Sequence, residues 1–84
     1  MYEYRILAIA DKLLGWMDLV LIDGALDFLE HNEARRGFEM LCDNICEVDV
    51  ALTEAEYMEM VSLGYDFGLD LHGVRFKCID GLRT

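Results

Sequence analysis

The cysteine and histidine side chains of this 84-residue chain could bind a zinc ion. Cys42 and Cys46 are four residues apart, so on a helix they share one face, and His31 or His72 could complete a zinc site. The chain lacks the close C-x-x-C or H-x-x-x-H pairs of structural zinc sites. An odd number of cysteines without C-x-x-C instead favours reduced, buried thiols in a cytosolic protein, and we predict no metal ion.

Nucleophilic and phosphate-binding chemistry lacks its usual residues. The single serine, Ser62, lies in a predicted helix with no motif around it, and a Ser–His pair needs both groups within reach. The seven glycines are scattered, and a calcium-binding loop starting at Asp43 would need glycine where Val48 stands. Paired carboxylates could act as acid and base, but among 17 acidic residues such pairs arise by chance. We therefore predict that the protein is not an enzyme and has no cofactor.

The acidic residues form the clearest pattern in the chain. The net charge is −10, and the stretch from Gly37 to Val74 holds nine acids and no lysine or arginine. Such a surface repels nucleic acid and anionic membranes and attracts a basic protein. The alternative is a solvated face that only keeps the protein soluble. The acids predicted to bind a basic partner are Glu39, Asp43, Glu47, Asp49, Glu54, Glu56 and Glu59.

Aromatic side chains would complete such a binding face, because tyrosine and tryptophan are enriched at the energetic centres of interfaces. For two of the tyrosines, a place in the hydrophobic core is an equally good interpretation. The candidates are Trp16, Tyr57, Tyr65, Phe67 and Phe76.

Helical periodicity places the acids on two helices. Asn32 can cap a helix that runs to Val48, on which Glu39, Asp43 and Glu47 form a stripe with a spacing of four residues. Like charges at this spacing mildly destabilise an isolated helix, so the stripe suggests that the charge is used. The expected apolar face of this helix is Phe38, Leu41, Cys42, Ile45 and Val48.

The next helix begins at a capping box, in which Thr53 is followed three residues later by Glu56. It runs to about Phe67, where Gly68 suits a C-terminal cap. The side chains expected to point inward are Tyr57, Met58, Val61 and Tyr65.

Two helices are predicted before these. The first spans Tyr2 to Leu14, and the second runs from an Asp18 cap to about Glu30. Gly24 within the second helix costs about 1 kcal/mol relative to alanine, so a close helix contact is expected there. The expected stripes are Tyr2, Ile6, Ile9, Ala10 and Leu13, and then Leu19, Ile22, Ala25, Leu26 and Leu29.

The last segment, Val74–Ile79, alternates apolar and polar residues as a strand does, but one strand cannot form a sheet. With no proline and 55% apolar residues, the chain predicts an all-α fold in a single domain over residues 1–84. We expect a compact bundle of about four helices with a short extended C-terminal tail. No run of about 18 apolar residues could span a membrane, and the start lacks a basic signal-peptide region, so we expect a cytoplasmic protein.

The stretch from Leu19 to Leu69 resembles the small helical immunity proteins of the Maf and contact-dependent growth inhibition toxin systems of bacteria. The resemblance is carried by IDGALDFLEHNE (22–33), FEMLCDNI (38–45) and LTEAEY (52–57), and Leu41-Cys42-Asp43 is its most distinctive part. The chain departs from the family pattern at His31-Asn32-Glu33, where glycine is frequent, and at Gly37, where a larger residue is usual. The first helix and the residues after Leu71 have no counterpart.

The resemblance implies an immunity protein without catalytic activity in the cytoplasm of the producing cell. It would bind the C-terminal domain of a cognate toxin, commonly a nuclease acting on RNA, as a one-to-one heterodimer. It does not identify the toxin. The alternative is an acidic helical adaptor or regulatory module that binds a basic protein or peptide.

Overall fold

The computed structural model describes residues 2–84, and these residues form five α-helices and no strand. The helices are α1 (Tyr2–Leu13), α2 (Leu19–Glu30), α3 (Ala34–Glu47), α4 (Glu54–Asp66) and α5 (Val74–Gly81). The all-helical prediction is confirmed, with one helix more than expected. No helix in this part of the chain has the length and apolar character needed to cross a membrane.

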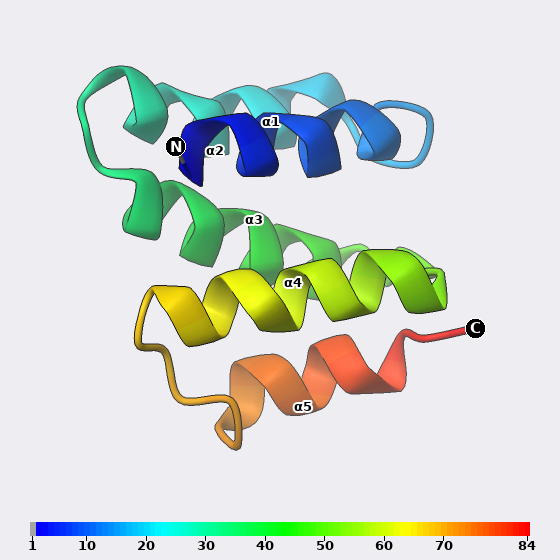
Figure 1. Cartoon of the computed structure of the whole chain (residues 1–84). Helices are drawn as coiled ribbons and strands as arrows, with labels where there is room; N and C mark the ends of the chain where they lie inside the picture. The colour runs from blue at the N-terminus through cyan, green and yellow to red at the C-terminus, as the bar shows by residue number, and fades with distance from the viewer. Residues whose placement is uncertain (1) are drawn as a thin grey trace.

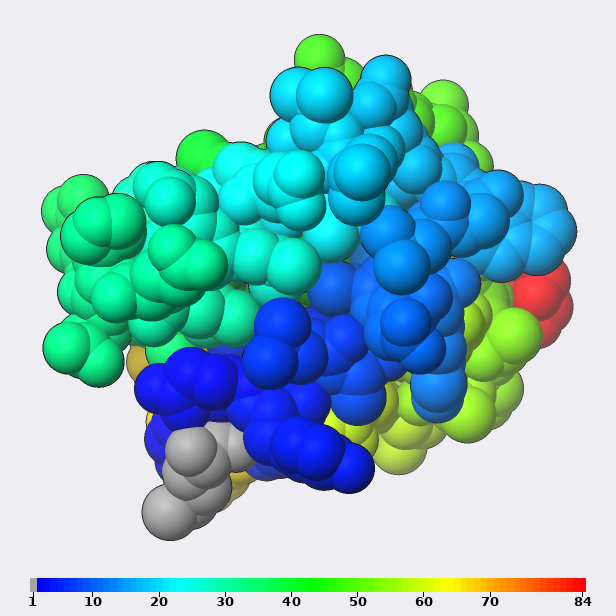
Figure 2. All heavy atoms as spheres, turned by 90° about the horizontal axis from the view of Figure 1, so that it is seen from above, coloured from blue at the N-terminus to red at the C-terminus, as the bar shows by residue number. Residues whose placement is uncertain are grey.

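α3 lies at the centre of the fold (Figure 1). α2 packs along one side of α3 and makes the most extensive helix contact, and α5 packs on the other side. Successive helices run in opposite directions. The turn after α1, the end of α3, the start of α4 and the C-terminus therefore lie at one end of the molecule. Figure 2 looks onto the face formed by α1 and α2.

The hydrophobic core is built around one face of α3. Phe38, Leu41, Cys42 and Ile45 are all fully buried, as their helical spacing predicts. Val48 was expected on the same face, but it follows the helix as its C-cap and is largely exposed. The buried residues of α1 also match the prediction, and they are Ile6, Ile9, Ala10 and Leu13.

Two predicted N-terminal caps are confirmed. The Asp18 carboxylate accepts a hydrogen bond of 3.0 Å from the backbone N–H of Val20 at the start of α2. At the start of α4, the Glu56 N–H donates to the Thr53 hydroxyl, and the Thr53 N–H donates to the Glu56 carboxylate. This reciprocal pair is the capping box that the sequence indicates.

Helices α2, α3 and α4 each end with a residue in the left-handed conformation, at φ 59° for Asn32, 53° for Asp49 and 73° for Gly68. The residue after each of them donates a backbone hydrogen bond back into the last helical turn, which satisfies a free carbonyl group. The Gly68 cap confirms its prediction. The prediction for Asn32 is wrong, because Asn32 closes α2 and α3 begins after Glu33, whose side chain makes no capping hydrogen bond.

The inward face predicted for α4 is only partly correct, because Tyr57 and Val61 pack against the core but the other two predicted residues do not. Met60, Leu63 and Gly64 are buried, whereas Met58 and Tyr65 are 56% and 75% exposed. Apolar residues occur all round this helix, so two different stripes satisfy the helical period. Packing against α5 decides between them, because Phe76 of α5 lies directly on Gly64.

The prediction of an extended C-terminal tail is also wrong, since Val74–Gly81 forms the helix α5. Phe76 and Ile79 are buried and lie three residues apart, so the segment has a helical stripe as well as an alternating one. A segment of six residues is too short to distinguish the period of a helix from that of a strand.

Beyond α5, the C-terminal residues pair with the loop before α4. The Leu52 N–H donates to the Leu82 carbonyl and the Thr84 N–H donates to the Leu52 carbonyl, both at 2.9 Å, in an isolated pairing of backbone segments.

The close approach of α2 to another helix lies at Gly37 and not at Gly24. A Cβ atom at Gly37 would sit 2.7 Å from the backbone oxygen of Ala25 in α2. A Cβ at Gly24 would make only an ordinary contact of 3.7 Å with the sulfur of Met40. The absence of a side chain at Gly37 therefore lets α2 and α3 pack together.

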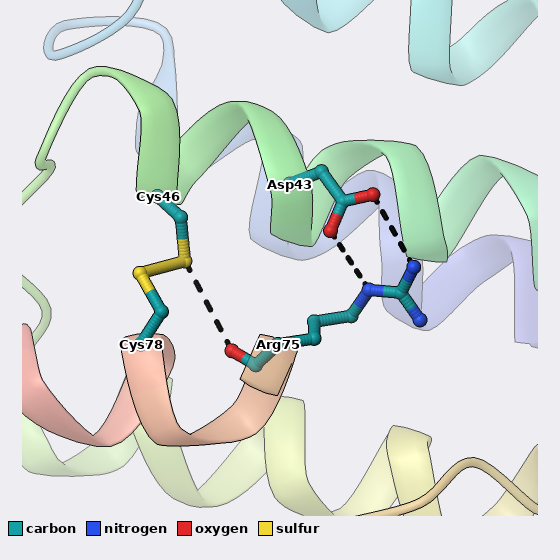
Figure 3. The surroundings of a disulfide bond; sticks show 4 residues. All are labelled: Asp43, Cys46, Arg75 and Cys78. Atoms are coloured by element: carbon teal, nitrogen blue, oxygen red, sulfur yellow. Dashed lines mark hydrogen bonds and ion pairs between the residues drawn. A yellow bond between two sulfur atoms is a disulfide. The ribbon is translucent and has the colours of Figure 1, made fainter. Parts of the chain in front are cut away.

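A disulfide bond joins Cys46 of α3 to Cys78 of α5, with Cα atoms 6.1 Å apart (Figure 3). The prediction of three reduced thiols is therefore wrong, and only Cys42 is free. The sequence conceals this pairing because the two cysteines are 32 residues apart and Cys78 lies in the segment predicted to be extended. Burial raises the pKa of the Cys42 thiol, which keeps it protonated and unreactive.

We expect Gly37→Ala to lower the free energy of unfolding by about 2 kcal/mol, because the new methyl group meets rigid backbone. Gly24→Ala is the matched control in the partner helix. It should raise stability by up to about 1 kcal/mol, since it removes an exposed glycine from a helix interior. Urea denaturation of both variants measures the two changes, and equal shifts would contradict the close packing at Gly37.

We expect Cys78→Ser to lower the free energy of unfolding by about 3 kcal/mol, because the disulfide closes a loop of about 30 residues in the unfolded chain. Urea denaturation with and without a reducing agent measures the effect. The reducing agent should destabilise the original protein to a similar extent and leave the variant unchanged. No effect of the reducing agent on the original protein would show that the bond is not formed.

Candidate functional site

Arg75 of α5 binds two of the acids predicted to meet a partner. Its guanidinium contacts both carboxylate oxygens of Asp43, at 2.8 Å and 3.2 Å, and an oxygen of Glu39 at 3.1 Å. Figure 3 shows the two bonds to Asp43 beside the disulfide, so the ion pair and the covalent link both join α3 to α5. The hydrogen bonds from Arg75 to Asp43 raise the pKa of the Arg75 guanidinium.

Two other arginines outside the acidic stretch also fold back onto it. Arg5 of α1 contacts Glu59 at 2.7 Å and Asp66 at 2.8 Å on α4. Arg83 lies 3.5 Å from Glu54 at the start of α4 and also contacts Asp80. Ion pairs within the protein therefore neutralise much of the segment that has no base of its own.

The seven predicted acids consequently fall into three groups. Four of them, Glu39, Asp43, Glu54 and Glu59, are engaged in ion pairs. Glu56 is used in the capping box. Only Glu47 and Asp49, at the end of α3, are exposed and take part in no ion pair among residues 2–84.

Charge over the whole surface remains strongly negative. All five arginines contact acids of the protein itself. In the described part of the chain, nine acids make no ion pair, and they are Asp11, Asp18, Asp23, Asp27, Glu30, Glu47, Asp49, Glu56 and Asp70. Five of these lie on or beside α1 and α2 and are outside the set of acids predicted to bind a partner.

A groove of 290 Å³ runs between α1 and α2, on the face shown in Figure 2. It is mainly apolar, with two carboxylates at its edge, and its lining is Leu7, Ala10, Asp11, Leu14, Leu19, Ile22, Asp23 and Leu26. The groove was not predicted from the sequence. A signal was nevertheless present, because eight of the 12 residues of α2 are apolar, more than one buried face requires.

The five aromatic candidates differ in their exposure. Trp16 and Tyr65 are 73% and 75% exposed and can meet a partner. Phe76 is buried in the core, so its proposed role as an anchor is wrong. Phe67 packs between Tyr2 and Phe38, and Tyr57 lies under the guanidinium of Arg83.

A second hollow of 450 Å³ lies between α4 and α5, and its lining is mainly apolar but includes several titratable side chains. Its titratable side chains are Tyr57, His72, Lys77 and Asp80. Burial raises the pKa of the Tyr57 hydroxyl. The hollow contains no cysteine or serine nucleophile, and no group of three metal-binding side chains occurs within residues 2–84.

The candidate zinc site of Cys42, Cys46 and a histidine does not form. Cys46 is bound to Cys78, and the buried Cys42 belongs to the core face of α3. His31 lies at the end of α2, where its ring nitrogen pairs with the Asp27 carbonyl at 2.9 Å. That hydrogen bond and the charge of Asp27 raise the pKa of His31.

The structure thus offers exposed carboxylates and an apolar groove, which are features of a protein-binding surface. Comparisons of this chain with protein-family models, curated proteins and solved structures find no match.

Proposed function

We propose that this chain is an immunity protein that binds and neutralises a basic toxin domain, a ribonuclease, in a one-to-one complex. The observation that carries the proposal is the set of nine carboxylates that make no ion pair in residues 2–84, while every arginine is engaged within the protein. A nuclease that binds RNA needs a basic groove. Carboxylates on a rigid helical scaffold can occupy such a groove in place of phosphate groups.

The end of α3 is the best placed of the predicted acidic sites. Glu47 and Asp49 flank Val48, which is 44% exposed. The end of a helix carries partial negative charge from its free carbonyl groups, so both acids add to a field that attracts cations. Acids at this position destabilise the free protein slightly, and the left-handed conformation of Asp49 costs about 1 kcal/mol more.

The other predicted acids would act differently. Glu39, Asp43, Glu54 and Glu59 already bind arginines, so a partner must share or displace those arginines to reach them. Their main contribution would be to the long-range field, which raises the association rate and is weakened by salt. Inhibition by covering the toxin's active site and inhibition by blocking an adjacent RNA-binding surface are both compatible with this arrangement.

The proposed location is the cytoplasm of the producing cell. Thiols are generally reduced there, whereas the structure contains one disulfide. Alkylation of free thiols during cell lysis tests the location. Three alkylated cysteines fit a reducing cytoplasm, whereas modification of Cys42 alone after denaturation indicates an oxidising compartment.

The direct test is co-purification with the C-terminal domain of the toxin encoded nearest to this gene, followed by an RNA degradation assay. We expect a stable complex in which RNA is protected. A complex that leaves RNA degradation unchanged would favour the adaptor alternative, and the absence of a complex would remove the toxin proposal.

Glu47→Lys combined with Asp49→Asn should weaken toxin binding by about tenfold or more, mainly through slower association at low salt. The matched control is Glu30→Lys combined with Asp27→Asn, which changes the charge equally at the opposite end of the molecule, at the end of α2. Binding kinetics at two salt concentrations measure both variants. Equal losses in the two variants would show that net charge matters and that the end of α3 is not the contact.

The same double variant should unfold at the same urea concentration as the original protein or a higher one, because it removes unfavourable charge from a helix end. This distinguishes it from Asp43→Lys, which breaks the ion pair with Arg75 and so changes folding as well as binding.

A further inference from the structure

We propose that the groove between α1 and α2 is the docking site for a basic amphipathic helix of the partner protein. The inference rests on the proposed function only for the statement that the partner is a basic protein. The groove, its lining and its charges are properties of this chain.

The groove has an apolar lining of the kind that one face of an amphipathic helix can contact. Ala10 and Ile22 are buried at its base, and the partly exposed Leu7, Leu14 and Leu19 line its sides. Leu7 lies on α1 and Leu14 directly follows its last residue, so the two leucines, seven residues apart, are separated by about 10 Å along the helix direction. A helix lying in the groove could therefore insert apolar side chains at positions i, i+4 and i+7.

Further exposed apolar residues occur on the elements that form the groove. Tyr4, Trp16 and Val20 are each more than 70% exposed, and they lie on the same two helices and their connecting turn. Of the 11 exposed large apolar residues in the described chain, six fall within the first 20 residues. Scattered exposed apolar residues are ordinary, but a concentration of this kind marks an interaction surface.

The charges at the edge select the kind of partner. Asp11 and Asp23 line the groove from opposite helices, and neither makes an ion pair within residues 2–84. The lysine of α1, Lys12, does not line the groove. Covering Asp11 and Asp23 with an uncharged surface would leave two desolvated carboxylates unpaired, which is costly. Lysine or arginine residues beside the apolar stripe of the docking helix would pair with them.

A second copy of this chain is a poor occupant of the same groove. A symmetric dimer would bring Asp11 and Asp23 of both copies together, and each copy carries a net charge of −10. Like charges that face each other across an interface oppose binding. Charge complementarity therefore favours a basic helix over self-association.

The protein contains its own reporter for this site. Trp16 is the only tryptophan, and it lies in the turn between Leu14 and Leu19, which both line the groove. The probe is a synthetic helical peptide with leucines at i, i+4 and i+7 and lysines beside them. A peptide of the same composition in scrambled order is the control. We expect the first peptide to shift Trp16 fluorescence to shorter wavelength in a saturable way, and the scrambled peptide to bind at least about tenfold more weakly.

Two pairs of variants test the groove itself. Asp11→Lys with Asp23→Lys should weaken peptide binding by about tenfold relative to Asp27→Lys with Glu30→Lys, which changes the net charge equally outside the groove. Leu14→Gln should weaken binding, whereas Val74→Gln on α5, at a residue 85% exposed, should not. Circular dichroism verifies that each variant keeps its helices.

Several results would overturn the inference: no binding of the amphipathic peptide, equal binding of the scrambled peptide, or equal losses in the two charge variants. Sedimentation showing a dimer that Leu14→Gln dissociates would also overturn it in favour of self-association.

The proposed function is tested separately, because peptide binding without protection from the toxin would contradict immunity alone. Toxin inhibition that all groove variants retain would contradict the docking site alone.

Discussion

The packing of α2 against α3 is the contact on which the rest of this structure depends. It is possible because Gly37 has no side chain, which lets α3 approach the backbone of Ala25 in α2. That approach buries one face of α3 completely, and α1 and α5 then pack around the same central helix. In a domain of 84 residues the core is small, so a single displaced helix removes a large fraction of the buried surface.

The distribution of charge shows how folding changes the meaning of a sequence pattern. Along the chain, the acids from Gly37 to Val74 have no basic neighbours. In the folded protein, Arg5, Arg75 and Arg83 come from outside this segment and contact its acids. Arg75 and the Cys46–Cys78 disulfide both attach α5 to α3, so these acids hold the fold together as well as contributing to the negative field.

The surface available to a partner differs from the one predicted from the distribution of acids along the sequence. Glu47 and Asp49 remain exposed, but most other predicted acids have structural partners. The groove between α1 and α2 combines exposed leucines with two carboxylates, and it lies in the half of the chain that precedes the acidic stretch. No local pattern marks a groove, because its two walls come from separate helices. The excess of apolar residues on α2 is the one trace of it in the sequence.

The sequence by itself determined the helices whose signals are local: the buried faces of α1 and α3, the Asp18 cap, the Thr53–Glu56 capping box and the Gly68 terminus. These depend on side chains within one or two helical turns, so they are present in the sequence before folding. Tertiary structure decided which face of α4 is buried, that Val74–Gly81 is helical, and which acids and cysteines have partners. Those outcomes depend on residues about 12 to 60 positions apart, and only the close packing of the helices brings them together.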